Sequence, residues 1–307
     1  MKTRRIKTIL LFLSTMPFIG IYAQSIYYVS PHASSGGDGS PATPFHIIHE
    51  AVEKARKDKN CTTIYLREGE YILDTPLVLT SADGNDSKEL IIRNYPGEKA
   101  IISSGITLDL KWEKYKNGIM RAAVKGNPVM DMLIVNGDLR SMARYPDYDK
   151  TAVRFNGTSA LATAPERVKK WKNPEGGYFH AMHSHDWGDF HYRITGKNEK
   201  GELQLEGGWQ NNRPMGIHPE NRMVENIFEE LDAPGEWYYD KQEGWLYYYP
   251  LSDENINELV FETPQLKNLI EIAGTSSHPV KNITIEGIEL TQTIRTFMEH
   301  YEPLLRS

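Results

Sequence analysis

The sequence predicts an all-β protein: a parallel β-helix with an N-terminal capping helix and an inserted antiparallel β-sandwich. Two stretches, residues 88–105 and 281–293, contain short strands of alternating apolar and polar residues joined by tight polar bends. Such strands are typical of the turns of a solenoid, each of which buries its inner face on the next. The strands between these stretches are longer and their turns resemble those of hairpins. We therefore expect both stretches to pair in one parallel solenoid, with residues 106–262 outside it.

The first 23 residues are typical of a secretory signal peptide. Four positive residues precede an apolar run over residues 9–22, and Ala23 is a small residue suited to the position before the cut. A membrane anchor is disfavoured, because the run is shorter than the roughly 18–20 residues that a span needs and contains Pro17. We expect cleavage near Ala23 and a secreted or periplasmic mature chain of 284 residues (307 − 23).

Charge and composition point away from several partner classes. The net charge of −6 becomes −10 once the four positive residues of the signal are removed (−6 − 4), which disfavours nucleic acid and anionic membrane surfaces. The single cysteine, Cys61, excludes an internal disulfide. Six tryptophans and 17 tyrosines suit both β-structure and contact with a polysaccharide or oligosaccharide. No cofactor or metal is predicted, and the oligomeric state is left open.

The N-terminal elements follow in order. A strand over residues 25–30 precedes a glycine-rich loop, after which Thr43 can N-cap a helix that has Pro44 at its first position. Apolar residues then recur at helical spacing up to about Lys59. This amphipathic helix can cap the solenoid. The first solenoid strands are predicted at residues 63–66, 69–71, 76–79, 90–95 and 100–105.

The inserted elements begin near residue 107. Asn136-Gly137 predicts a tight hairpin turn, and polar bends at residues 197–201 and 240–244 predict two more. A short helix is expected over residues 164–171, and the chain returns to the solenoid at residues 266–272. The other inserted strands are predicted at residues 178–183, 190–195, 203–206, 236–239 and 245–249.

The ordered motifs carry a resemblance to a known family. They include Ala143-Arg144-Tyr145-Pro146, residues 231–238, residues 246–250 and residues 280–287. In this order they resemble bacterial right-handed parallel β-helix glycoside hydrolases with an inserted β-sandwich, most closely family 141 and more distantly family 120. The resemblance implies four parts: a signal peptide (1–23), the cap and first β-helix turns (24–105), the inserted domain (106–262) and the return to the β-helix (263–307).

The same resemblance implies a function. It suggests an exported protein that acts on plant-type polysaccharides, with α-L-fucoside or xylan-like linkages among the substrates. It also implies that the catalytic carboxylates lie on turns beyond residue 307, so the chain alone is expected to be inactive. Two alternatives stay open: a non-catalytic glycan-binding or structural β-helix fragment, and a polysaccharide lyase.

A histidine-rich stretch is the densest polar cluster and a candidate substrate site. Zinc is disfavoured, because structural zinc sites usually carry cysteines and catalytic ones have simpler ligand spacing. Histidines could instead hydrogen-bond sugar hydroxyls beside a tryptophan platform, or the loop could brace the sandwich on the solenoid. The sugar site and the bracing loop are equally favoured. We expect His183 and His185 to share one strand face. The candidates are His180, His183, His185, Trp187 and His191.

A second cluster combines an indole with amide and guanidinium donors, which suits the apolar face and hydroxyl ring of a pyranose. It consists of Trp209, Gln210, Asn211, Asn212 and Arg213. A buried Trp209 would instead be part of the core.

The catalytic residues are not identified from the sequence. Glycoside hydrolysis needs two carboxyl groups about 5–5.5 Å apart for retention or about 6.5–9.5 Å apart for inversion. Glu286 and Glu289 fall on different strands or faces and make a poor pair. Glu299 and Glu302 lie in a predicted turn and could reach a groove, although most surface glutamates are only solvated.

Overall fold

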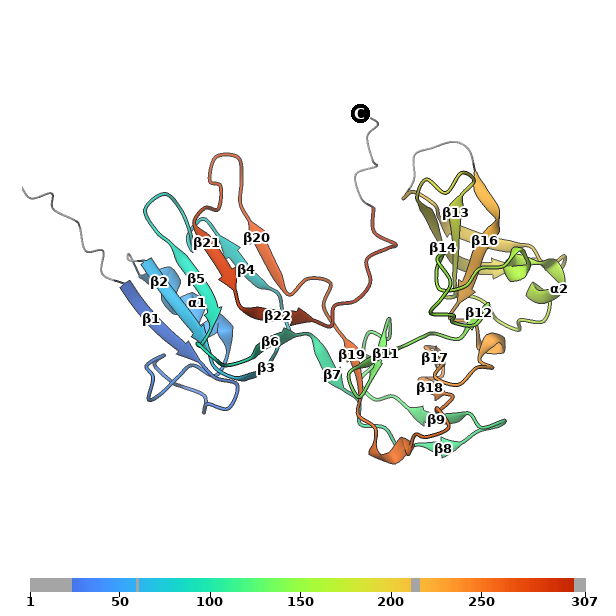
Figure 1. The fold of residues 1–307 in the computed structure, drawn as a ribbon, viewed down its shortest axis with the longest axis horizontal. Coiled ribbons are helices and arrows are strands. Elements are labelled where there is room, and N and C mark those ends of the chain that lie inside the picture. Colours follow the sequence, from blue (N-terminus) through green and yellow to red (C-terminus); the bar gives the residue numbers. More distant parts are fainter. Residues whose placement is uncertain (1–23, 59–60, 211–215, 301–307) are drawn as a thin grey trace, which may run out of the picture.

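The computed structural model describes residues 24–58, 61–210 and 216–300, so the predicted signal peptide lies outside the described residues. The regular secondary structure of this part of the chain is mostly β-strand with few helices, which confirms the all-β prediction. Figure 1 shows two lobes that meet near β7 (Gly105–Thr107) and β19 (Phe261–Pro264). Within the described ranges, no helix is long and apolar enough to cross a membrane.

One lobe, the parallel region, comprises residues 24–104 and 265–291 and contains three parallel sheets. The predicted pairing of its two distant stretches is confirmed, because Ile285 pairs with Ile92 and Leu290 pairs with Ile102. The first sheet has the order β1 (Gln24–Val29), β2 (Cys61–Leu66), β5 (Leu90–Asn94) and β21 (Ile283–Glu286). The second has β3 (Gly69–Ile72), β6 (Ala100–Ser103) and β22 (Ile288–Thr291), and the third pairs β4 (Leu77–Thr80) with β20 (Ile270–Ala273).

Aliphatic side chains in register form the core of the parallel region. Ile64, Ile92 and Ile285 pair across β2, β5 and β21, and the first two are fully buried. Side chains alternate along a strand, so the neighbouring positions face outward, where Arg93 pairs with Glu286 at 2.9 Å. The alternating pattern of the sequence therefore has a direct physical counterpart.

Gly287 makes the bend between β21 and β22, as the sequence predicts. Its φ is +68°, and a Cβ atom there would lie 2.0 Å from Oδ1 of Asn94. Only glycine meets both demands.

The predicted helix is present as α1 (Ile48–Lys57), and its apolar face packs on the parallel sheets. The predicted cap at Thr43 is wrong. The Thr43 hydroxyl donates to Asp38 at 2.6 Å, and the Thr43 carbonyl accepts from the Asp38 and Gly39 N–H groups. Thr43 thus closes the preceding loop, and the helix begins at Ile48. At the other end, the Lys88 ammonium donates to the carbonyls of Ala55, Arg56 and Ala82.

The second lobe, the inserted region, comprises residues 105–264 and contains three antiparallel sheets. The Asn136-Gly137 hairpin is confirmed, with φ values of 50° and 85° and Val135 paired with Asp138. The hairpins predicted at residues 197–201 and 240–244 join antiparallel pairs. One four-stranded sheet has the order β11 (Asp138–Arg140), β10 (Leu133–Val135), β19 and β7. The other has the order β17 (Trp237–Asp240), β18 (Trp245–Tyr248), β9 (Met120–Ala123) and β8 (Glu113–Lys114). The five-stranded sheet has the order β12 (Arg144–Tyr145), β16 (Ile217–Glu225), β13 (Tyr178–His183), β14 (Asp189–Lys197) and β15 (Leu203–Gly207).

Strand β16 was missed by the sequence analysis. It is polar and contains Pro219, which lies where its register with β13 shifts between Ala181 and His183. Proline in a sheet is confined to edges and bulges, so Pro219 argued against a strand here although it is accommodated at the register shift.

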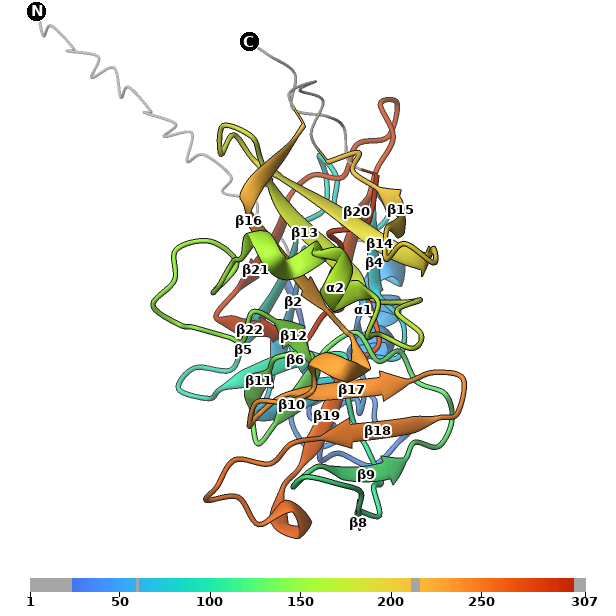
Figure 2. The ribbon, with the colours of Figure 1, turned by 90° about the vertical axis from the view of Figure 1, so that its right-hand side faces the viewer.

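The inserted region has separate cores. Side chains from β10, β17, β18 and β19 share one core, so two of the antiparallel sheets pack face to face. The five-stranded sheet has its own core, where Trp171 packs beside α2 (Pro165–Val168). Figure 2 shows α2 and the five-stranded sheet apart from β8, β9, β17 and β18.

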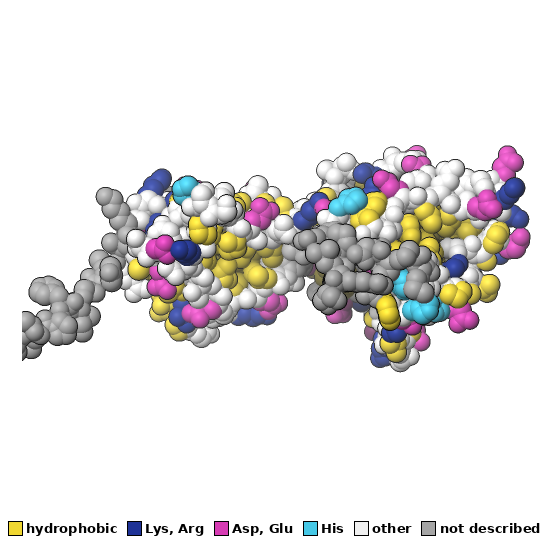
Figure 3. All heavy atoms as spheres, turned by 90° about the horizontal axis from the view of Figure 1, so that it is seen from above, with side chains coloured by type: hydrophobic (Ala, Val, Ile, Leu, Met, Phe, Trp, Pro, Cys, Tyr) yellow, Lys and Arg dark blue, Asp and Glu magenta, His cyan; other side chains and the backbone are white. Residues whose placement is uncertain are grey.

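Within the part of the chain that the structure describes, strands β20, β21 and β22 each pair on one side only. Ile272 and Leu290 on these strands are more than half exposed. Figure 3 shows hydrophobic side chains gathered on the surface of the parallel region.

Candidate functional site

Two cavities open on the inserted region. The large cavity has a volume of about 1110 Å³ and lies between the segment before β10, the strands β13 and β14, the end of β17, and residues 294–299. The small cavity, of about 480 Å³, lies beside β11, β12 and the loop before β17. Asp131 and Arg295 line both cavities.

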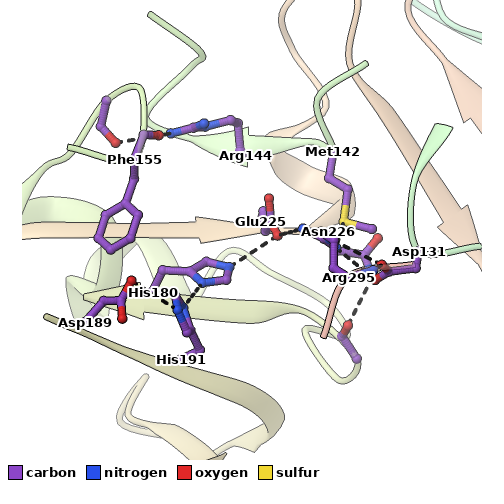
Figure 4. A network of polar contacts seen from close by, with 12 residues as sticks. Asp131, Met142, Arg144, Phe155, His180, Asp189, His191, Glu225, Asn226 and Arg295 are labelled. Carbon is purple, nitrogen blue, oxygen red and sulfur yellow. Dashed lines mark hydrogen bonds and ion pairs between the residues drawn. The ribbon is translucent and has the colours of Figure 1, made fainter. Parts of the chain in front are cut away.

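A polar network extends from the wall that the two cavities share (Figure 4). Arg295, which follows β22, donates to both oxygens of Asp131 and forms an ion pair with Glu225 at the end of β16. Nε2 of His180 lies 3.2 Å from Oε1 of the same glutamate. The chain after the last parallel strand is therefore attached to the inserted region by partly buried ion pairs.

Burial and charge act against each other in this network. Burial alone would raise the pKa of Glu225, but the Arg295 guanidinium and the His180 hydrogen bond outweigh it and lower that pKa. Burial would lower the pKa of Arg295, and Glu225 and Asp131 raise it instead. Burial lowers the pKa of His180, which is therefore neutral near pH 7. Glu225 is therefore held ionised, and His180 is held neutral.

The two histidines at the centre lie directly opposite each other on β13 and β14. Their Nδ1 atoms are 2.7 Å apart, and Nε2 of His191 lies 3.3 Å from Asp189. A neutral His180 that donates to Glu225 through Nε2 must accept at Nδ1. His191 then donates from Nδ1 and, when doubly protonated, from Nε2 to Asp189. The His191 contact lowers the pKa of Asp189.

No candidate of the histidine-rich stretch, His180 and His191 included, lines either cavity. The expectation that His183 and His185 share a strand face is wrong, because β13 ends at His183 and the chain turns at residues 184–188. The His185 N–H donates to Nδ1 of the buried His183. Trp187 is 58% exposed in this turn.

The second cluster is held against the terminal segment. The indole of Trp209 stacks on His300 with ring centroids 4.0 Å apart, and its Nε1 donates to the Glu299 carbonyl. Gln210 donates to the Phe297 carbonyl. One face of the indole is thus covered, and the role of this cluster in sugar binding stays a prediction.

Four candidates, Asn211, Asn212, Arg213 and Glu302, lie outside the described residues. Among the predicted site residues that are described, Glu299 lines the large cavity, and Lys267 pairs with its carboxylate. Sequence reasoning assigned no role to Tyr178, Arg193, Tyr239 or Glu236, each of which lines a cavity. Glu236 stands in the motif at residues 231–238, which supported the family resemblance, and in a predicted strand, but neither indicated a binding role. No sequence pattern around Arg295 predicted its role in the network.

The histidines do not gather into a metal site. Over residues 24–58, 61–210 and 216–300, no group of three or more His, Cys, Asp and Glu residues could hold an ion.

Comparisons with known proteins show similarity of fold. No family model matches the chain. A curated relative, the uncharacterized protein YwoF of Bacillus subtilis, is 34% identical over 88 residues, which is 28% of this chain and 17% of YwoF. A solved structure described as a glycoside hydrolase matches with a TM-score of 0.70 and 22% identity. It covers 88% of this chain, and the chain spans about half (51%) of its length.

A second solved structure, a complex of XylC with xylose, matches with a TM-score of 0.40 and 14% identity over 87% of this chain and 35% of that one. The described region therefore shares its fold with a protein described as a glycoside hydrolase.

Proposed function

We propose that this chain is part of an exported carbohydrate-active protein of the glycoside hydrolase class and that the large cavity binds a glycan. The observation that supports this proposal is the lining of the cavity. Aromatic rings of Tyr178, Tyr239 and Phe297 stand beside many hydrogen-bonding side chains. Sugars offer both an apolar face and a ring of hydroxyls to such a surface.

The size of the large cavity supports an oligosaccharide. Pockets for drug-sized ligands measure about 300–1,000 Å³, and this cavity measures about 1110 Å³. Asn173, Glu206 and Gln242, which line the cavity, are exposed and offer hydrogen-bonding groups to several sugar units. Xylan-like and α-L-fucoside linkages are the substrates we propose first.

The proposal includes the architecture. We propose that the three parallel sheets are the faces of a right-handed parallel β-helix, into which residues 106–262 are inserted as a domain. The parallel pairing of β21 with β5 and of β22 with β6, across nearly 200 residues, supports this interpretation. Export by a signal peptide over residues 1–23 is part of the same proposal, and N-terminal sequencing of the exported protein tests it.

Calorimetric titration of the chain with xylo-oligosaccharides and α-L-fucosylated oligosaccharides tests glycan binding. We expect Asn173→Ala and Glu206→Gln to weaken binding by about two- to tenfold each, the worth of one hydrogen bond. Gln204→Ala is the matched control, because Gln204 is exposed on the same strand as Glu206 and does not line the cavity. Equal affinities for all these proteins would place the glycan elsewhere, and hydrolysis is assayed separately from binding.

A further inference from the structure

The small cavity contains an acid that the proposed function does not use. Glu236 lies in the loop before β17, lines the cavity and is only 2% exposed. Its Oε2 accepts from the N–H groups of Asp232 and Ala233 at 3.3 Å each. Its buried Oε1 has no hydrogen-bond partner among the described residues. A buried polar atom without a partner is costly, so this oxygen is suited to a ligand.

The loop that carries Glu236 is firmly held. The Gly235 N–H donates to the Tyr249 carbonyl at 2.7 Å, and the Tyr249 N–H donates back to the Glu236 carbonyl at 2.9 Å. The position of the acid is thus set by backbone pairing, independently of any ligand.

The other charges around the small cavity balance one another. Its lining contains three arginines, Arg140, Arg144 and Arg295, and three carboxylates besides Glu236, namely Asp131, Asp147 and Glu225. The arginines are already engaged: Arg140 with Glu254, Arg144 with three backbone carbonyls, and Arg295 with Asp131 and Glu225. A ligand that enters this cavity meets little net charge and many polar groups.

The protonation state of Glu236 determines whether its side chain can donate a hydrogen bond. Burial raises its pKa to about 8, the two backbone N–H groups oppose this shift, and Asp232 and Asp147 add to it. Arg144 is the cation that faces it. The side chain therefore carries a proton at neutral pH and offers an O–H donor.

We propose that the small cavity is a second binding site, for a single neutral sugar unit, in which Oε1 of Glu236 donates a hydrogen bond to a ligand oxygen. The volume of about 480 Å³ suits such a ligand. Tyr148 and Leu139, both more than half exposed, offer apolar surface to one face of a pyranose. This site does not depend on glycan binding in the large cavity.

The test is binding of D-xylose and L-fucose, with glucosamine as a cationic and glucuronate as an anionic comparison, measured by ligand-observed NMR between pH 6 and 9. We expect the neutral sugars to bind best and their affinity to fall about tenfold or more as the pH passes 8. Glu236→Gln keeps a donor of similar shape, so its binding is expected to persist with little dependence on pH. Glu236→Leu removes the donor and is expected to abolish binding.

Three outcomes would overturn the proposal: equal pH profiles for the wild type and Glu236→Gln, unchanged binding by Glu236→Leu, or tighter binding of glucosamine than of xylose. If the leucine variant does not fold, the pH profile of the glutamine variant decides alone. Gln204→Ala, at an exposed position that lines neither cavity, is the control and must leave monosaccharide binding unchanged.

Discussion

The two regions of this protein are stabilised in different ways. The parallel region buries aliphatic side chains in register, such as Ile64 on Ile92, and pairs charges such as Arg93 and Glu286 on the outer surface, with the buried Asp83 paired to Arg56 as an exception. The inserted region buries Trp171 and Trp237 fully, and with them the ionisable residues Glu236 and Arg144. Repetition of one strand pattern suffices for the first. The second depends on individual polar contacts, and both cavities open on it.

The largest effect is expected at the charged network. Arg295→Ala leaves Glu225 and Asp131 largely buried without their cation, which costs about 3–5 kcal/mol. Tryptophan fluorescence during urea unfolding measures this loss, because all six tryptophans lie between residues 112 and 245. Lys125→Ala, which breaks an exposed pair with Asp109, is the control and should change stability little. A loss below about 1 kcal/mol for Arg295→Ala would show that the network is dispensable.

The aliphatic core of the parallel region comes next. Ile92→Ala is expected to cost about 2–5 kcal/mol, because it leaves a cavity in a fully packed core. The half-exposed Ile72 supplies the control, Ile72→Ala.

Circular dichroism reports both regions, whereas fluorescence reports only the inserted one. We expect Ile92→Ala to shift the transition seen by circular dichroism and not the fluorescence transition, because the cores share no residues. Coincident shifts would show that both regions unfold as one cooperative unit.

A smaller effect is expected where the parallel region does contain a buried charge. Lys88→Met removes an ammonium that donates to two carbonyls at the end of α1 and to the Ala82 carbonyl, and we expect a loss of about 1–3 kcal/mol. Thermal unfolding followed by circular dichroism measures it, with the exposed Lys54→Met as control. A neutral result would mean that water replaces the ammonium at no cost.

The smallest effect is a pH dependence centred on Glu236. Its pKa is raised from 4.5 to about 8 on folding, so its contribution to stability is complete below pH 4.5 and is lost as the pH rises through 8. Relative to Glu236→Gln, the wild type should lose up to about 1.4 kcal/mol between pH 6 and 7. Urea unfolding across this range tests it, with Glu243→Gln at an exposed position as control. Parallel pH profiles would show that Glu236 is ionised when folded.

Local pattern predicted much of the secondary structure. The alternation of apolar and polar residues predicted the strands of the parallel region, because a strand that is buried on one face has an apolar residue at every second position. Asn136-Gly137 gave a hairpin, because both residues adopt positive φ. The pattern failed for β16, whose Pro219 lies at a register shift, and for the start of α1, where Thr43 bonds to Asp38 instead.

The candidate site was predicted only in part, for a physical reason. His180 and His191 could be suspected from the sequence, because they stand in one polar stretch. Glu225, which contacts His180, lies 45 residues after it, and Arg295 lies 70 residues after Glu225. No local pattern connects these residues. The sequence by itself determined the all-β class, the repeating strands and the hairpins, because these depend on neighbours along the chain. The cavities, the ion pairs of Arg295 and the raised pKa of Glu236 were decided by tertiary structure, because burial and charge depend on which distant segments meet.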